Sequence, residues 1–159
     1  IVHAKTAALF AAACEIGPVI SGGGRDAHEL MRMFGTNLGI AFQIADDVLD
    51  YSANQAKLGK RIGDDFREGK ITAPVLFALE KATQEERAFW ERTLKNLNQK
   101  PDDLKKAQDI LARHDALEEG MHKARTYAGN ALLSLELMPK SLVRNALGEL
   151  VSFTVEREF

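Results

Sequence analysis

Three acidic residues, Asp46, Asp47 and Asp50, have the types and spacing that could do chemistry. If their segment is helical, Asp46 and Asp50 lie one turn apart on one face, with Asp47 beside them. Gln43 would sit one turn earlier on the same edge. At an effective dielectric of about 20, two carboxylates roughly 5 Å apart repel by about 3 kcal/mol, which a divalent cation would relieve. Because oxygen-only ligands favour magnesium over zinc, the pattern predicts a magnesium site.

A solvated acidic face is the alternative interpretation of these three aspartates, since most charge runs are solvated faces. The neighbouring residues argue against it because they are apolar: Ile40, Ala41, Phe42, Ile44, Ala45, Val48 and Leu49. Charged groups on a helix that is mostly buried are paired, metal-bound or functional. The metal site is therefore the favoured interpretation.

The segment that follows, residues 52–70, combines glycine with charges of both signs. Lys60, Arg61, Arg67 and Lys70 come ten to twenty residues after Asp50, and they are interleaved with Asp64, Asp65 and Glu68. Basic side chains beside a carboxylate-bound cation form a suitable cradle for a diphosphate. Taken alone, the segment is better explained by charges that neutralise one another in a solvated loop.

Helical periodicity accounts for the elements that must position these residues. Apolar spacing and turn signals predict seven helices, over residues 1–16, 26–51, 73–82, 84–97, 102–113, 117–137 and 141–157. Asp26 and Thr72 occupy N-cap positions of two of them. No alternating strand pattern occurs, so we expect an all-α fold in a single unit spanning residues 1–159.

Composition excludes several classes of protein. Hydrophobic residues make up 45% and charged residues 28% of the 159 residues, which is typical of a globular chain. A formal net charge of -2 argues against a nucleic-acid partner bound through a basic field. The longest low-polarity run, residues 7–14, is too short to span a membrane. A single cysteine, Cys14, fits a reducing compartment, and we expect a cytoplasmic protein.

Two long motifs resemble those of one enzyme family. Residues 39–50 (GIAFQIADDVLD) resemble the second aspartate-rich motif of the trans-isoprenyl diphosphate synthases, GxxFQxxDDxxD. Residues 59–74 (GKRIGDDFREGKITAP) resemble the loop that follows it in that family. Lys5-Thr6-Ala7 and the segments around residues 124–139 and 146–147 also match in order. The resemblance implies the C-terminal half of the all-α isoprenoid synthase bundle.

The resemblance also assigns roles to individual residues. It makes Asp46, Asp47 and Asp50 ligands of magnesium, directly or through water. Lys5 and Lys60 would contact the allylic diphosphate, with Lys70 nearby, and Thr6 and Gln43 would line the reacting end. The implied reaction joins isopentenyl diphosphate head to tail to an allylic diphosphate, giving a medium- or long-chain product such as octaprenyl diphosphate. The implied assembly is a homodimer.

One departure from the family pattern shapes these expectations. The family carries a further aspartate-rich motif on an earlier helix, and this sequence contains no second DDxxD. We therefore expect the N-terminal half of the synthase to be absent and the isolated chain to be inactive. One alternative is a non-catalytic subunit of a heteromeric prenyl synthase. A terpene cyclase ranks last, because cyclases lack the loop pattern of residues 59–74.

Overall fold

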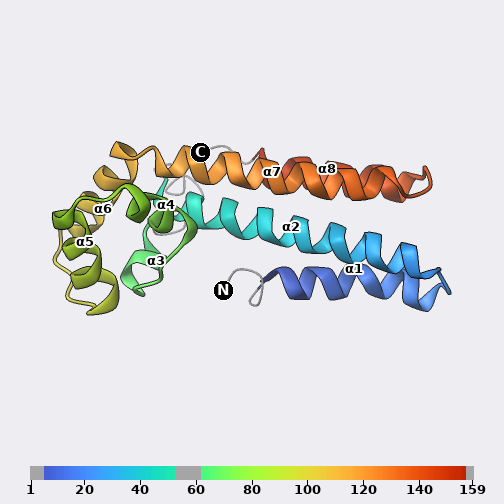
Figure 1. The fold of residues 1–159 in the computed structure, drawn as a ribbon, viewed down its shortest axis with the longest axis horizontal. Coiled ribbons are helices and arrows are strands. Elements are labelled where there is room, and N and C mark those ends of the chain that lie inside the picture. The colour runs from blue at the N-terminus through green and yellow to red at the C-terminus, as the bar shows by residue number, and fades with distance from the viewer. Residues whose placement is uncertain (1–5, 53–61, 157–159) are drawn as a thin grey trace. The chain divides into compact units, whose positions relative to one another are not determined.

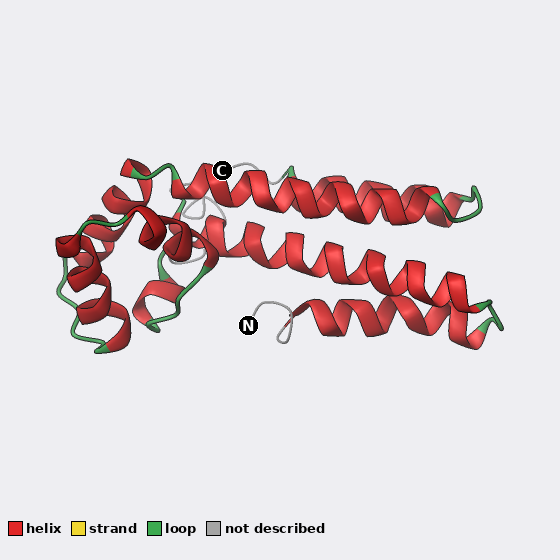
Figure 2. Ribbon diagram, viewed as in Figure 1, coloured by secondary structure: helices red, strands yellow, loops and turns green. Residues whose placement is uncertain are grey.

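The computed structural model describes residues 6–52 and 62–156, and over these ranges every regular element is a helix (Figure 2). The all-α prediction is confirmed. In chain order the elements are α1 (Ala8–Ile20), α2 (Arg25–Tyr51), α3 (Asp64–Arg67), α4 (Ala73–Lys81), α5 (Gln84–Trp90), the π-helix η3 (Glu91–Lys95), α6 (Asp103–Arg113), α7 (Ala116–Glu136) and α8 (Leu142–Val155).

The first two helices differ at their ends from the sequence prediction. The prediction that the first helix ends at residue 16 was wrong, because α1 continues through Gly17 and Pro18 to Ile20. Gly17 has no Cβ to meet the proline ring, and Gly23 N–H donates to the Pro18 carbonyl at 2.8 Å. Asp26 lies inside the first turn of α2 and is not its N-cap. The helix dipole favours an acidic residue in that turn.

The chain divides into two compact units, and α2 and α7 each contribute to both. The first unit comprises described residues 6–45 and 123–156, and the second comprises residues 46–52 and 62–122. The expectation of one unit spanning residues 1–159 stays a prediction.

Close packing of α1 against α2 shapes the first unit (Figure 1). A Cβ at Gly39 would lie 2.7 Å from the Ala7 Cα, and one at Gly35 would lie 2.8 Å from the Ala11 Cα. Only glycine therefore permits this approach. The buried core joins α2, α7 and α8 through Phe34, Leu38, Ala41, Ala128, Ala131, Leu135 and Val151.

The second unit has its own core, which surrounds the last residue of α2. Tyr51 is buried there with residues from the shorter helices and the start of α7: Phe66, Val75, Ala78, Phe89, Trp90, Leu94, Ala107, Ile110, Leu111 and Ala116. This core fixes the end of α2 relative to α3 and α4. Within the described ranges, no helix is both long enough and apolar enough to cross a bilayer.

Candidate functional site

Asp46, Asp47 and Asp50 all lie in the last two turns of α2, within the second unit. Asp46 is half-buried, whereas Asp47 and Asp50 are only 5% and 7% exposed. The negative end of the helix dipole makes this an unfavourable place for three carboxylates. Their stability there requires donors from other elements.

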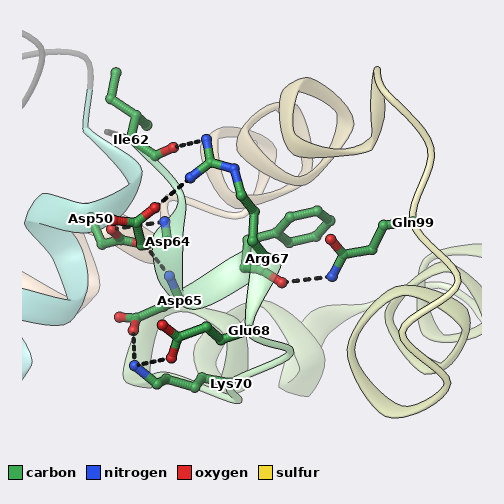
Figure 3. Close-up of polar contacts among 9 residues, drawn as sticks. Asp50, Ile62, Asp64, Asp65, Arg67, Glu68, Lys70 and Gln99 are labelled. Atoms are coloured by element: carbon green, nitrogen blue, oxygen red, sulfur yellow. Dashed lines mark hydrogen bonds and ion pairs between the residues drawn. The ribbon is translucent and has the colours of Figure 1, made fainter. Parts of the chain in front are cut away.

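Backbone N–H groups at the start of α3 supply donors to Asp50 (Figure 3). The Asp64 N–H donates to Asp50 Oδ1 at 3.2 Å, and the Asp65 N–H donates to Oδ2 at 3.0 Å. Gly63, whose φ is +80°, donates its own N–H to the Asp50 carbonyl at 2.8 Å. Because Gly63 has no side chain to cap α3, the Asp50 carboxylate takes that role.

The N-terminus of α4 binds Asp47 in the same way. The Ala73 N–H donates to Asp47 Oδ2 at 3.1 Å. Thr72 holds the N-cap position as predicted, but its side chain makes no capping hydrogen bond. Each of the two buried carboxylates thus accepts from the start of another helix, where the dipole favours negative charge.

The three carboxylates fit a magnesium ion in the chemistry of their donors, since hard divalent cations prefer oxygen. Within residues 6–52 and 62–156, no three acidic, histidine or cysteine side chains converge to form a metal cluster by themselves. A carboxylate oxygen that accepts one N–H keeps a further lone pair. The residues therefore fit an ion that takes its remaining ligands from water and phosphate, as magnesium usually does.

The electrostatics of the site also favour a cation. Burial raises the pKa of Asp50; the Asp65 N–H opposes this effect, while the charges of Asp65 and Asp64 add to it. Burial likewise raises the pKa of Tyr51, and the charges of Asp50, Asp65 and Asp47 act in the same direction. Negative charge is thus held here at a cost in free energy that a cation would reduce.

Lys70, a predicted diphosphate contact, forms ion pairs within the loop (Figure 3). Its Nζ lies 2.8 Å from Asp65 Oδ1 and 2.8 Å from Glu68 Oε2, and these hydrogen bonds raise the pKa of Lys70. Asp65 links Asp50 to Lys70, a connection that the sequence prediction missed because it assigned the Asp65 charge to neutralisation of the loop. Its place two residues after Gly63 was the available signal.

Thr6 and Gln43, predicted to line the reacting end, are in contact within the first unit. The Thr6 hydroxyl donates to Gln43 Oε1 at 2.6 Å. The close packing at Gly39 makes this contact possible, since it brings the start of α1 against α2. Lys5 and Lys60 lie outside the described residues, and their roles stay predictions.

Comparison with known proteins places the chain in one protein family. The all-helical fold and the acidic end of α2 accompany a match of residues 1–111 to the sequence profile of the Polyprenyl synthetase family. This match covers more than half of the chain. The chain therefore belongs to the polyprenyl synthetase family.

Individual relatives are synthases of different product lengths. The chain is 33% identical to the octaprenyl diphosphate synthase of Haemophilus influenzae, over 100% of this chain and 48% of the relative. It is 39% identical to the geranylgeranyl diphosphate synthase of Sulfolobus acidocaldarius, over 96% of this chain and 47% of the relative.

A solved structure is similar in fold as well as in sequence. The polyprenyl synthase of Caulobacter crescentus, crystallised with calcium and isoprenyl diphosphate, matches with a TM-score of 0.90 at 42% identity. The match covers 99% of this chain and 48% of the synthase. The chain thus spans about half the length of the relatives it matches.

Proposed function

We propose that the intact protein is a prenyltransferase that joins isopentenyl diphosphate head to tail to an allylic diphosphate. Family membership supports the reaction class, and the acidic end of α2 is the observation that carries the assignment to this chain. The relatives make products of different lengths, so a medium- or long-chain product such as octaprenyl diphosphate stays a prediction. A homodimer and a cytoplasmic location also stay predictions.

Magnesium is the proposed cofactor, held by Asp46, Asp47 and Asp50 directly or through water. When bound, it would supply positive charge that stabilises the departing diphosphate. Asp47 and Asp50 already accept backbone donors from α4 and α3, which restricts the positions of their carboxylates before an ion binds. Preorganisation of this kind lowers the free-energy cost of stabilising charge in the transition state.

The basic and polar residues complete the proposed site. An ammonium group has three donors, so Lys70 keeps one for a phosphate oxygen while it binds Asp65 and Glu68. We assign Lys5 and Lys60 to the same diphosphate. The oxygens of Thr6 and Gln43 are assigned to the reacting end, where they would stabilise the allylic cation and assist proton removal.

Incorporation of radiolabelled isopentenyl diphosphate by the intact protein, with an allylic primer and magnesium, tests this proposal. Asp46→Asn should lower the rate by about 100-fold or more, because it removes one of the charges proposed to hold the magnesium ion. Asp109→Asn, the same chemical change on an exposed position of α6, should leave the rate unchanged. No incorporation by the wild-type protein with any allylic primer, or equal rates for the two variants, would contradict the proposal. Activity that appears only with a second protein would instead favour the subunit of a heteromeric synthase.

A further inference from the structure

We infer that Asp50 and Gln99 are positioning residues that hold the segment 62–70 from its two sides. The inference rests on the proposed function, in which this segment places Lys70, paired with Asp65, beside the diphosphate. It gives Asp50 a task that Asp46 does not share. It also brings in a residue, Gln99, that lies outside both sequence motifs.

The helix at the centre of this segment cannot fix its own position. α3 contains only four residues, and a helix of one turn is unstable in isolation because nucleation costs more than its few hydrogen bonds return. Its location must therefore come from contacts with other elements. Phe66 packs α3 into the core of the second unit, and Figure 3 shows that polar contacts reach the segment from α2 on one side and from the connection before α6 on the other.

Asp50 holds the start of the segment through three hydrogen bonds. Its carboxylate accepts the N–H groups of Asp64 and Asp65, and its carbonyl accepts that of Gly63. The bonds to Asp64 and Asp65 lock the backbone from which the Asp65 side chain projects. Asp65 in turn binds Lys70 at 2.8 Å, so the position of the ammonium group depends on the same backbone.

Gln99 holds the other end of α3. Its Nε2 donates to the Phe66 carbonyl at 2.7 Å and to the Thr93 carbonyl at 3.0 Å. Both Phe66 and Thr93 are buried, at 2% and 0% exposure, so their carbonyls have little access to replacement donors from solvent. One side-chain amide thus ties α3 to the π-helix η3.

Asp50 and Gln99 differ chemically, and this difference makes the inference testable. Gln99 carries no charge, and the hydrogen bonds described for it go to backbone carbonyls and not to a carboxylate. Replacing Gln99 should therefore not alter metal binding directly. If both residues position the segment, Gln99→Met and Asp50→Ala should both accelerate amide exchange across residues 62–70. A role of Asp50 limited to the metal would give no shared effect.

Amide hydrogen exchange of the intact, substrate-free protein measures the segment itself. Asp50→Ala and Gln99→Met should each accelerate exchange across residues 62–70 by about tenfold, the loss expected for a hydrogen bond of about 1.4 kcal/mol. Asp50→Asn keeps one acceptor oxygen and should restore part of the protection. Asp46→Ala should leave exchange in 62–70 unchanged, and Glu119→Gln on α7 is the control for general loss of stability.

Steady-state kinetics then relate position to the reaction. Gln99→Met should raise KM for the allylic diphosphate at least fivefold with no change in the magnesium concentration at half-maximal rate. Asp46→Ala should raise that magnesium concentration. Unchanged exchange and KM in Gln99→Met would overturn the inference, even if Asp50→Ala fails to fold. An inactive wild-type protein would overturn the proposed function, and exchange would still decide whether Asp50 and Gln99 hold the segment.

Discussion

Asp103→Asn should destabilise the second unit by about 1.5 to 2.5 kcal/mol at pH 7. Asp103 is 5% exposed, and its two carboxylate oxygens each accept a guanidinium N–H of Arg92 at 2.8 Å. Oδ2 also accepts the Lys100 N–H at 2.7 Å. These bonds close the connection that contains Gln99.

The magnitude follows from the pKa of this carboxyl group. The Arg92 guanidinium lowers the pKa of Asp103 from 3.8 to about 2, which corresponds to about 2.5 kcal/mol of stability. The Arg92 side chain is 30% exposed, so solvent screening weakens the ion pair, and the lower limit of the expected loss of stability is about 1.5 kcal/mol. Because the pKa is lower in the folded state, this stabilisation is complete above about pH 5 and is lost as the pH falls through about 2.

Denaturant unfolding followed by tryptophan fluorescence measures this loss of stability in the second unit. Trp90 is the only tryptophan in the sequence and is buried in the core of the second unit. The difference between wild-type and Asp103→Asn proteins should shrink between pH 4 and pH 2. The neighbouring exposed residue provides the matched control, Asp102→Asn. A difference below about 0.5 kcal/mol at pH 7, or one that does not shrink in acid, would refute the reasoning.

Two further substitutions and one binding measurement have defined outcomes. Gly39→Val should separate α1 from α2, because its Cβ would meet the Ala7 Cα at 2.7 Å, and thermal unfolding should show a loss of 1 kcal/mol or more, estimated roughly from overpacking. Glu86→Gln should lower stability at pH 7 but not below pH 2, because the hydrogen bond from His114 and those from its neighbours lower the pKa of Glu86 to about 2. Thermal melting of both proteins across pH measures this; if the bonds to Glu86 contribute nothing, the two melting temperatures will not approach each other in acid. The 159-residue chain should bind magnesium only weakly without diphosphate, and tight binding in calorimetry would contradict this.

Helix positions were largely predictable because they depend on local patterns. Apolar spacing placed α2, α4, α6 and α7 within one residue at either end. The end of α1 was not predictable, since the cost of Pro18 depends on contacts and backbone geometry at Gly17 and Gly23. The prediction of one helix over 84–97 did not separate α5 from the π-helix η3, because both are helical and differ only in their backbone hydrogen bonding.

The candidate site was only partly predictable. The three aspartates and Gln43 share one helix, so their register follows from a spacing of 3.6 residues per turn. The contact of Thr6 with Gln43 joins residues 37 positions apart, and the sequence placed it only through family resemblance. Gln99 belongs to no motif, and its bond to Phe66 spans 33 positions.

The sequence by itself determined that the chain is helical, that α2 ends in three carboxylates, and that these resemble a family motif. It did so because helix register is local. Only the tertiary structure decided that Asp47 and Asp50 accept backbone donors from α4 and α3 while Asp46 stays more exposed. Those donors lie 14 to 26 residues away along the chain, and the folded core of the second unit brings them to the end of α2. Identical residue types thus acquire different environments, because burial and hydrogen bonding are set by packing and not by spacing along one helix.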